Sequence, residues 1–365
     1  MSEPVQSVLH EAQEARGATF RDDDGWLWTM GFGDGLAGYE AVTGSVAIWD
    51  VYPLVKWVVT GPDAGAAIQT VFSNDVGTQQ VGQVKYGAFL ADDGTMVDDG
   101  TVFKHAEDRF WVFSNTSGFG DHWRAQLGGL DVEIVNRLHE LPLIAVQGPR
   151  SREVLQSLTD TDLSGLGYFR FLPDQIEVAG VRAWISRTGF TGELGFELVP
   201  DRSGAVQIWE ALTAAGAVPI GLDTIEPTRI ESGLIIYGTD YTPGEHTPYD
   251  VSLDRMVALS GSASFLGRQQ LVATAAAPPN RLKTLRFEGT ELPEVGAPVL
   301  VDGVEVGRLS SRVISPRFGA IGLAMLETDA SADGTIVEVP LGAGTVRATV
   351  DVLGIKDPNK LRPRS

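Results

Sequence analysis

Two neighbouring carboxylates stand in the segment LADDGTMVDDGTVF, residues 90–103. The Asp-Asp-Gly run at 92–94 predicts a hairpin turn, but Asp98 and Asp99 follow where the return strand should already have begun. Neighbouring strand residues point to opposite faces, so one of this pair is expected to face inward. Such a carboxylate has one of two roles. It either fixes the backbone by accepting hydrogen bonds, or it faces a cleft with a pKa that is raised or tuned for function. The spacing leaves both readings open.

A second group of protic side chains occupies the stretch TRIESGLIIYGTDYTPGEHTPYDVSLDRMV, residues 228–257. Ligand-contacting side chains tend to sit in Gly- and Pro-broken loops of this kind. The alternative reading is a helix end followed by a solvated loop. His246 has no second histidine at metal-ligand spacing, so no metal site is predicted. The side chains concerned are Arg229, Glu231, Tyr237, Asp240, Tyr241, His246 and Tyr249.

The segment SRTGFTGELGFELVP, residues 186–200, contains a third candidate. Residues 182–186 and 195–199 predict the two strands of a hairpin, and the glycines between them predict a wide loop. Glu197 is unexpected there, because it interrupts an otherwise apolar strand that should have one buried face. Further polar residues crowd the loop, namely Arg187, Thr188, Thr191 and Glu193.

The composition excludes several classes of function. The 365 residues carry 28 Lys and Arg against 48 Asp and Glu, a formal charge of −20 that disfavours nucleic acid and anionic membranes as partners. The absence of cysteine removes disulfides, thiolate nucleophiles and Cys-ligated metals. Neither a signal peptide nor a membrane span is expected, so the cytoplasm is the default location. Dinucleotide, P-loop and hydrolase motifs are missing.

Short strand patterns alternate with short helical ones over most of the chain. Residues 55–61 and 110–115 predict strands, whereas 203–216 predicts a helix with Val206, Trp209 and Leu212 facing inward. Beyond the proline-containing stretch AAAPPN the pattern changes to short strands joined by Gly-rich turns. The expected fold class is therefore α+β, followed by a separate all-β domain.

Taken together, these stretches resemble the aminomethyltransferase family, whose type member is the T-protein of the glycine cleavage system. They also resemble its relatives, the tetrahydrofolate-dependent demethylases. The similarity runs in order along nearly the whole chain. It is carried by IWDVYPLVKWVVTGPDA, FSNDV, GQVKYGAFLADDGTMVDDGTVF, IAVQGPRS, SRTGFTGELGFELVP, GLDTIEPTRIESGLIIYGTD, TPYDVSLDRMV, SFLGRQQL and GRLSSRVISPRFGAIGLAML.

The resemblance implies a three-domain cloverleaf around a central channel, of the aminomethyltransferase type. Residues 1–50 and 141–272 would form a discontinuous folate-binding α+β domain. Residues 51–140 would form a second α+β domain that carries the paired aspartates. Residues 278–365 would form a C-terminal all-β, barrel-like domain. Tetrahydrofolate would enter this channel with its pterin buried and its glutamate tail outward.

The resemblance also implies roles for individual residues. Glu197 would be the carboxylate that binds the 2-amino and ring N–H groups of the pterin, a charge-assisted contact. Asp98 or Asp99 would support the reduced pterin near N5 and N10. Tyr241 and His246 are candidate catalytic acids on the side of the second substrate, as is Tyr237. The further cofactor-contacting residues would be Arg229, Tyr86, Asn115, Arg187, Phe190 and Tyr237.

Departures from the family pattern bear on the reaction. Tyr52-Pro53-Leu54 stand where glycine cleavage enzymes usually carry Ser-His-Met, and Phe190 replaces their usual Tyr. These changes favour a demethylase that moves a methyl group from a small O-, S- or N-methyl compound to tetrahydrofolate, giving 5-methyltetrahydrofolate. One alternative is the glycine cleavage reaction, in which a lipoyl carrier protein is the partner and 5,10-methylenetetrahydrofolate the product. Another is a non-catalytic folate-binding relative. The sequence does not identify the methyl donor.

Overall fold

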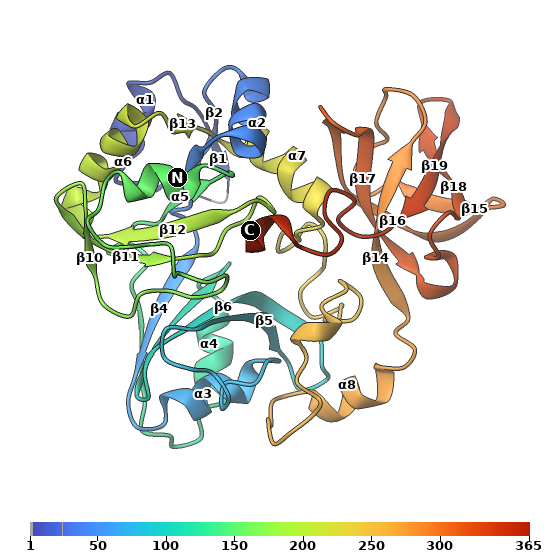
Figure 1. The fold of residues 1–365 in the computed structure, drawn as a ribbon. Helices are drawn as coiled ribbons and strands as arrows, with labels where there is room; N and C mark the ends of the chain where they lie inside the picture. The colour runs from blue at the N-terminus through green and yellow to red at the C-terminus, as the bar shows by residue number, and fades with distance from the viewer. Residues whose placement is uncertain (1–2, 24) are drawn as a thin grey trace.

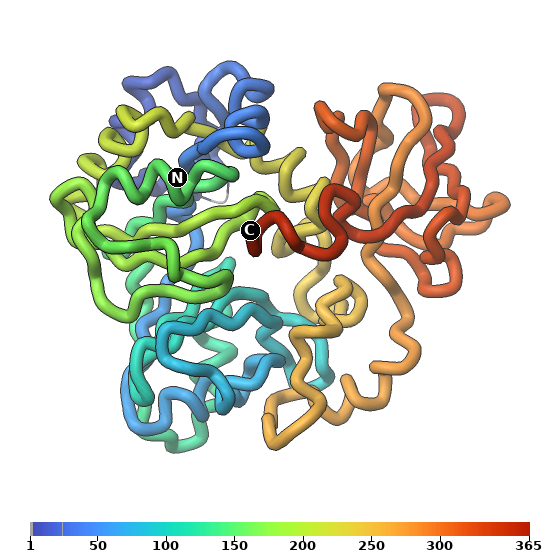
Figure 2. Tube along the Cα trace, viewed as in Figure 1, coloured from blue at the N-terminus to red at the C-terminus, as the bar shows by residue number. Residues whose placement is uncertain are grey.

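Three large β-sheets and a two-stranded ribbon organise the computed structural model, which describes residues 3–23 and 25–365 (Figure 1). Two of the large sheets are open and the third closes into a barrel. Figure 2 shows the barrel standing apart from the two open sheets, with the last residues of the chain returning toward the first sheet. The ribbon consists of β1 (Thr19–Asp23) and β2 (Trp26–Gly31).

The first sheet has the strand order β10-β11-β12-β9-β3-β13. Helix α6 packs on it through the fully buried Trp209 and Leu212, whereas Val206 is 39% exposed. The prediction that Val206 faces inward was therefore wrong, because it lies off the face that α6 turns to the sheet. The elements are β3 (Ala47–Asp50), β9 (Ile144–Gln147), β10 (Ile176–Val178), β11 (Val181–Ser186), β12 (Gly195–Pro200), β13 (Val218–Pro219), α1 (His10–Glu14), α2 (Gly35–Gly44), α5 (Ser151–Gln156) and α6 (Ala205–Ala214).

The second sheet is antiparallel, with the order β5-β6-β7-β4-β8. One face packs on its own helices through Trp57 and Trp123. The other face contributes Phe103, Trp111 and Phe113 to an apolar core shared with the first sheet. The two sheets therefore meet over aromatic side chains. The elements are β4 (Val55–Thr60), β5 (Val84–Leu90), β6 (Met96–Ala106), β7 (Arg109–Ser114), β8 (Glu133–Asn136), α3 (Ala64–Val71) and α4 (Phe119–Arg124).

The third sheet is a closed barrel with its own apolar interior. Residues 237–271, which precede it, pack between the barrel and the second sheet in one core with Leu90 and Leu323. The division into three domains remains a proposal, because this segment packs on both the barrel and the second sheet. The elements are α8 (Arg268–Thr274), β14 (Asn280–Phe287), β15 (Pro298–Val301), β16 (Val304–Ser315), β17 (Gly319–Glu327), β18 (Ile336–Leu341) and β19 (Gly344–Asp351).

Helix α7 (Leu222–Ser232) connects the first sheet's side of the molecule to the barrel. It contacts α2, β2 and β16, and most of its residues are buried although it has no apolar stripe. Buried charges need partners. Arg229, 1% exposed, donates to Asp240 (2.6 Å), to Glu226 (2.8 Å) and to Ser311 of the barrel (2.8 Å). This network ties α7 to the barrel.

A second buried network holds the C-terminal segment against α7 and the hairpin loop. Glu231 accepts from Tyr39 (2.8 Å) and from Ser315 of the barrel (2.6 Å). Lys356 forms an ion pair with Glu193 (2.7 Å), and Arg362 pairs with the same carboxylate (2.8 Å). The barrel is thus linked to the first sheet through its own end as well as through α7.

The predicted α+β fold with a C-terminal barrel is confirmed. Within residues 3–23 and 25–365, none of the helices combines the length and apolarity that crossing a membrane requires.

Substitution of Asp240 should destabilise the protein strongly. The Asp240 carboxylate accepts four hydrogen bonds: from Arg229, from the Ile236 N–H, and from the hydroxyls of Ser310 and Ser311. Asp240→Asn removes the charge opposite a buried guanidinium, so we expect a loss of about 3–5 kcal/mol in unfolding free energy. Chemical unfolding measures it. Glu226→Gln, at a partly exposed partner of the same arginine, is the control and should cost much less. Equal small losses would contradict this assignment.

Candidate functional site

Asp98 is fully buried and accepts five hydrogen bonds. The donors to Oδ1 are the Asp99 N–H (2.8 Å) and both the N–H and the side-chain amide of Asn115 (3.1 and 2.8 Å). Thr116 donates to Oδ2 from its N–H and its hydroxyl (3.1 and 3.2 Å). Burial and the neighbouring Asp99 raise the pKa of Asp98 to about 7, although these bonds oppose the rise. Asp98 therefore fastens the turn after β7 to strand β6.

Asp99 is held mainly by phenols. Tyr86 donates to Oδ2 (2.8 Å), and Tyr241 donates to Oδ1 (2.6 Å), which also receives the Asn115 amide (3.2 Å). Burial raises the pKa of Asp99, while these three donors lower it. Burial and the adjacent carboxylates raise the pKa of the Tyr241 phenol, so that it retains its proton.

Both aspartates are buried, which differs from the expectation that only one would face inward. Asp98 is 0% exposed and Asp99 7%. The reason is that β6 is covered at both positions: the backbone of Asn115 and Thr116 packs on Asp98, and Tyr86 and Tyr241 pack on Asp99.

Glu197 lies in β12 and faces a small cavity between the two open sheets. The Thr188 hydroxyl donates to its Oε2, and Ser186 lies 2.7 Å from that hydroxyl. Across residues 3–23 and 25–365, the one hydrogen bond to the Glu197 carboxylate is that to Oε2, and no donor reaches Oε1. Burial raises the pKa of Glu197, whereas Thr188 and the positive charge of Lys56 lower it. One carboxylate oxygen is thus free to accept from a ligand.

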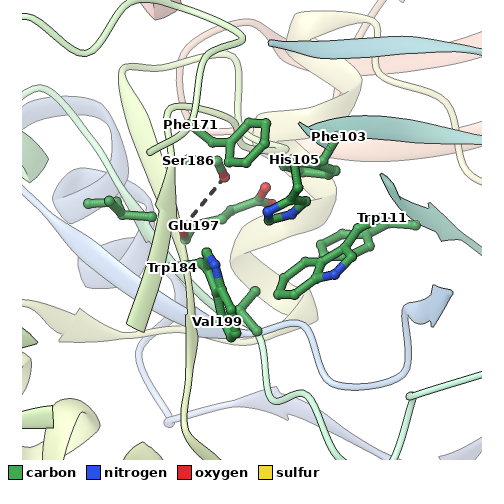
Figure 3. Close-up of a pocket in the computed structure, with 10 residues that line it drawn as sticks. Phe103, His105, Trp111, Phe171, Trp184, Ser186, Glu197 and Val199 are labelled. Carbon is green, nitrogen blue, oxygen red and sulfur yellow. Dashed lines mark hydrogen bonds between the residues drawn. The ribbon is translucent and has the colours of Figure 1, made fainter. Parts of the chain in front are cut away.

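The cavity is walled by aromatic rings from both sheets, as Figure 3 shows. Trp111 and Trp184 meet edge to face with ring centroids 4.6 Å apart, and Phe103 and Phe171 do so at 5.5 Å. The remaining space is about the size of one water molecule. Its lining residues are Phe103, His105, Trp111 and Phe113 of the second sheet, Trp184, Ile185, Ser186, Glu197 and Val199 of the first, and Phe171, which is bridged to Ser186 of β11.

Lys56 is a functional candidate that sequence reasoning missed. Its side chain is fully buried, and its Nζ donates to the Tyr52 carbonyl (2.9 Å). Burial lowers the pKa of Lys56 to about 7, although the charges of Asp50 and Glu197 raise it. Because Lys56 pairs across strands with Phe113, its side chain shares the face of the sheet that lines the cavity. The signal was a lysine inside an apolar strand.

The remaining predicted residues lie in different places. Tyr237 joins the aspartate cluster, with its ring 5.9 Å from that of Tyr241. Phe190 packs at the edge of the core between the two sheets. Arg187 donates to backbone carbonyls of Leu166 and of the C-terminal segment, at Pro363 (3.2 Å each) and Ser365.

Arg229 and His246 also have partners within the protein. The Arg229 guanidinium is engaged by Asp240, Glu226 and Ser311, as described above. His246 accepts the Thr242 N–H at Nδ1 (3.0 Å) within its own turn. Among the described residues, no cluster of three or more His, Cys, Asp or Glu side chains is arranged to hold a metal ion.

The glycines of the hairpin loop accommodate other side chains of the protein. A Cβ atom on Gly189 or Gly195 would lie 2.0 or 2.4 Å from the Gln147 amide, and one on Gly192 would lie 2.1 Å from the Ser232 hydroxyl. Gln147 is fully buried and donates to the Thr188 carbonyl (3.3 Å). The loop is therefore packed around Gln147, which keeps Thr188 beside Glu197.

Comparison with known families identifies the class of protein. The family model described as "GCVT N-terminal domain" matches residues 9–261. The one described as "Glycine cleavage T-protein C-terminal barrel domain" matches residues 280–354. The chain therefore belongs to the glycine cleavage T-protein family, and the predicted family is confirmed.

Individual relatives are similar over almost their full length. A protein of Streptomyces avermitilis named "Aminomethyltransferase" is 35% identical over 367 residues, covering 97% of this chain and 95% of that protein. One of the same name from Listeria welshimeri is 33% identical, covering 96% and 97%. The crystal structure of glycine cleavage system aminomethyltransferase T from Bartonella henselae superposes with a TM-score of 0.88 at 21% identity, covering 97% and 98%. That last likeness concerns the fold.

The two aspartates should respond differently to amidation. Asp98→Asn would place an NH₂ group against the Thr116 donors or the Asn115 donors, so we expect a loss of about 2–4 kcal/mol in unfolding free energy. Asp99→Asn should cost about 1 kcal/mol, because hydroxyl partners can reorient to accept as well as donate. Chemical unfolding of both variants beside the parent measures the difference. A larger loss for Asp99→Asn would refute the structural role of Asp98.

Proposed function

We propose that the protein is a tetrahydrofolate-dependent aminomethyltransferase, which yields 5,10-methylenetetrahydrofolate. The family acts on one-carbon units with tetrahydrofolate as cofactor, in agreement with the predicted cofactor. The observation that carries the proposal is the free oxygen of Glu197 at an aromatic cavity between the two open sheets. A lipoyl-bearing carrier protein is the proposed partner.

The residues at the cavity match the chemistry of the amino-bearing edge of a reduced pterin. A pterin is a flat heterocycle with N–H donors along one edge, and a buried carboxylate accepts such donors in charge-assisted bonds. Phe103 and Phe113 offer apolar surface for the ring. The Lys56 charge favours the ionised form of Glu197, which is the form that accepts. Bound tetrahydrofolate would supply a nucleophilic nitrogen for the one-carbon unit.

We propose Asp99 as the group that transfers protons and stabilises charge near N5 and N10 of bound tetrahydrofolate, where the reaction takes place. Its two oxygens are oriented by Tyr86 and Tyr241, which fix the carboxylate before substrate arrives. Tyr241 was predicted as a catalytic acid, but its hydroxyl is committed to Asp99 and its pKa is raised. We therefore propose Tyr241 as a positioning residue. His246 remains an alternative proton donor through its second ring nitrogen.

The aminomethyl reading is favoured over demethylation. The relatives compared above are named aminomethyltransferases, whereas the argument for a demethylase rested on the changed segment at Tyr52 and on Phe190. Tyr52 is 3% exposed, its hydroxyl lies 3.0 Å from His139 Nδ1, and its ring meets Trp26 edge-on at 5.6 Å. This substitution therefore has a packing explanation and does not by itself require a different substrate.

The folate product distinguishes the candidate reactions. We expect the protein, incubated with tetrahydrofolate and an aminomethyl-loaded lipoyl carrier, to form methylenetetrahydrofolate, detected by mass. Asp99→Asn should lower the rate by about 10²–10⁴-fold, the range for lost acid–base catalysis, while remaining folded. Methyltetrahydrofolate from a small methylated compound, with no reaction of the carrier, would instead establish a demethylase. Unchanged folate with either donor would indicate a binding protein.

Glu197→Gln should weaken tetrahydrofolate binding about 5- to 150-fold, because the amide offers one acceptor and adds a donor against the ligand's N–H groups. Calorimetry measures it, with the exposed Glu177→Gln of the same sheet as control. Burial raises the pKa of Glu197, so below that pKa a proton must leave before the ligand binds. Affinity should therefore fall as the pH falls, and the variant should lose this dependence. Unchanged affinity in a folded variant would exclude the role.

A further inference from the structure

His105 presents an unsatisfied nitrogen inside the cavity. Its side chain is 5% exposed, and no residue within 3–23 and 25–365 forms a hydrogen bond with its Nε2. The ring lies against Trp111 and Phe171, with centroids 4.5 and 4.6 Å apart. A buried polar atom without a partner lowers stability, so such atoms are uncommon and call for an explanation. A phenylalanine would fill this aromatic site without that cost.

The nitrogen is available as an acceptor. Burial and the nearby charge of Arg109 lower the pKa of His105 to about 4, so the ring is neutral near pH 7. The backbone of Pro173 interacts with the ring, and because proline has no N–H it can only accept. Because Nε2 has no partner among the described residues, we place the ring proton on Nδ1 and the lone pair on Nε2.

His105 and Glu197 line the same cavity from opposite sheets, β6 and β12 (Figure 3). The space between the lining residues is about that of one water molecule, which is also the size of an amino group. Two acceptors of different charge thus face a space suited to a small donor. The mechanism proposed above uses only Glu197.

We propose that His105 Nε2 accepts a hydrogen bond from the 2-amino group of the pterin, so that His105 and Glu197 together recognise this group. This inference rests on the proposed function. A pterin presents three donors along this edge, two on the amino nitrogen and one on the ring nitrogen. A carboxylate that binds the ring N–H and one amino N–H leaves the second amino N–H without an acceptor. His105 supplies that acceptor, at a site where an apolar wall would leave the donor unpaired.

The inference separates binding from folding. His105→Phe removes an orphaned polar atom and keeps an aromatic ring, so the ligand-free variant should unfold at the same temperature as the parent or at a higher one. The same variant should bind tetrahydrofolate about two- to twelvefold more weakly, the factor that corresponds to one net hydrogen bond. His105→Gln keeps an acceptor near the position of Nε2 and should bind more tightly than His105→Phe.

The decisive experiment pairs these variants with a modified ligand. Calorimetry is run on the parent, His105→Phe and Phe171→Leu, with tetrahydrofolate and with an analogue that carries a methyl group in place of the 2-amino group. We expect His105→Phe to weaken tetrahydrofolate but not the analogue. Phe171→Leu, the packing control, should affect both ligands alike.

Three other outcomes would overturn the inference. Equal weakening of both ligands by His105→Phe would mean that the histidine acts through packing, and no weakening of either would mean that Nε2 binds only water. In both cases the proposed function stands if Glu197→Gln still lowers tetrahydrofolate affinity. Failure of the parent protein to bind tetrahydrofolate would overturn the inference and the proposed function together.

Discussion

The ion pair between Arg229 and Asp240 is the interaction on which the rest of the architecture depends. Its two side chains are 2% and 0% exposed, so neither charge can be hydrated. Asp240 also accepts from two barrel serines and from the Ile236 N–H, and it directly precedes Tyr241. The pair therefore fixes α7, the barrel and the segment that brings Tyr241 to Asp99. The position of Tyr241 against Asp99 therefore depends on the ion pair that neutralises the buried Arg229 guanidinium.

The buried carboxylates Asp98, Asp99 and Glu197 accept hydrogen bonds from two kinds of donor, backbone N–H groups and hydroxyls. This difference distinguishes the structural carboxylate from those of the candidate site. Asp98 is bound largely by backbone N–H groups, whose directions cannot change without moving the chain. Asp99 and Glu197 are bound mainly by hydroxyl groups, which can turn. A carboxylate held by rotating donors can shift its hydrogen bonds when a ligand arrives. This explains why Asp99 and Glu197 are the stronger functional candidates.

Local patterns in the sequence were sufficient to predict the hairpin of β11 and β12 and to single out Glu197. The alternation of polar and apolar residues has the period of a strand, and one carboxylate interrupted it. The same reasoning pointed to the aspartate pair but could not assign roles, because the deciding partners are distant. Asn115 is 17 residues from Asp98, and Tyr241 is 142 residues from Asp99.

Other features could not be inferred from local sequence. His105 resembles an ordinary strand residue until the first sheet covers it, and for Lys56 the one local signal was a lysine inside an apolar strand. Arg229 and Arg187 were predicted to contact the cofactor, and their roles there remain proposals. In the structure the Arg229 side chain forms hydrogen bonds with acidic and hydroxyl groups of the protein, and the Arg187 side chain does so with backbone carbonyls. A cation's partner is set by the tertiary fold, which residue type and spacing do not encode.

The C-terminal return has a consequence for synthesis on the ribosome. Glu193 sits in the hairpin loop of the first sheet, yet the cations that neutralise it, Lys356 and Arg362, are translated about 160–170 residues later. At about 5–20 residues per second, the first sheet spends about 10–30 seconds with this carboxylate unpaired. During that interval the loop must keep Glu193 in water. The hairpin that carries Glu197 can therefore reach its final packing only after the barrel has been made.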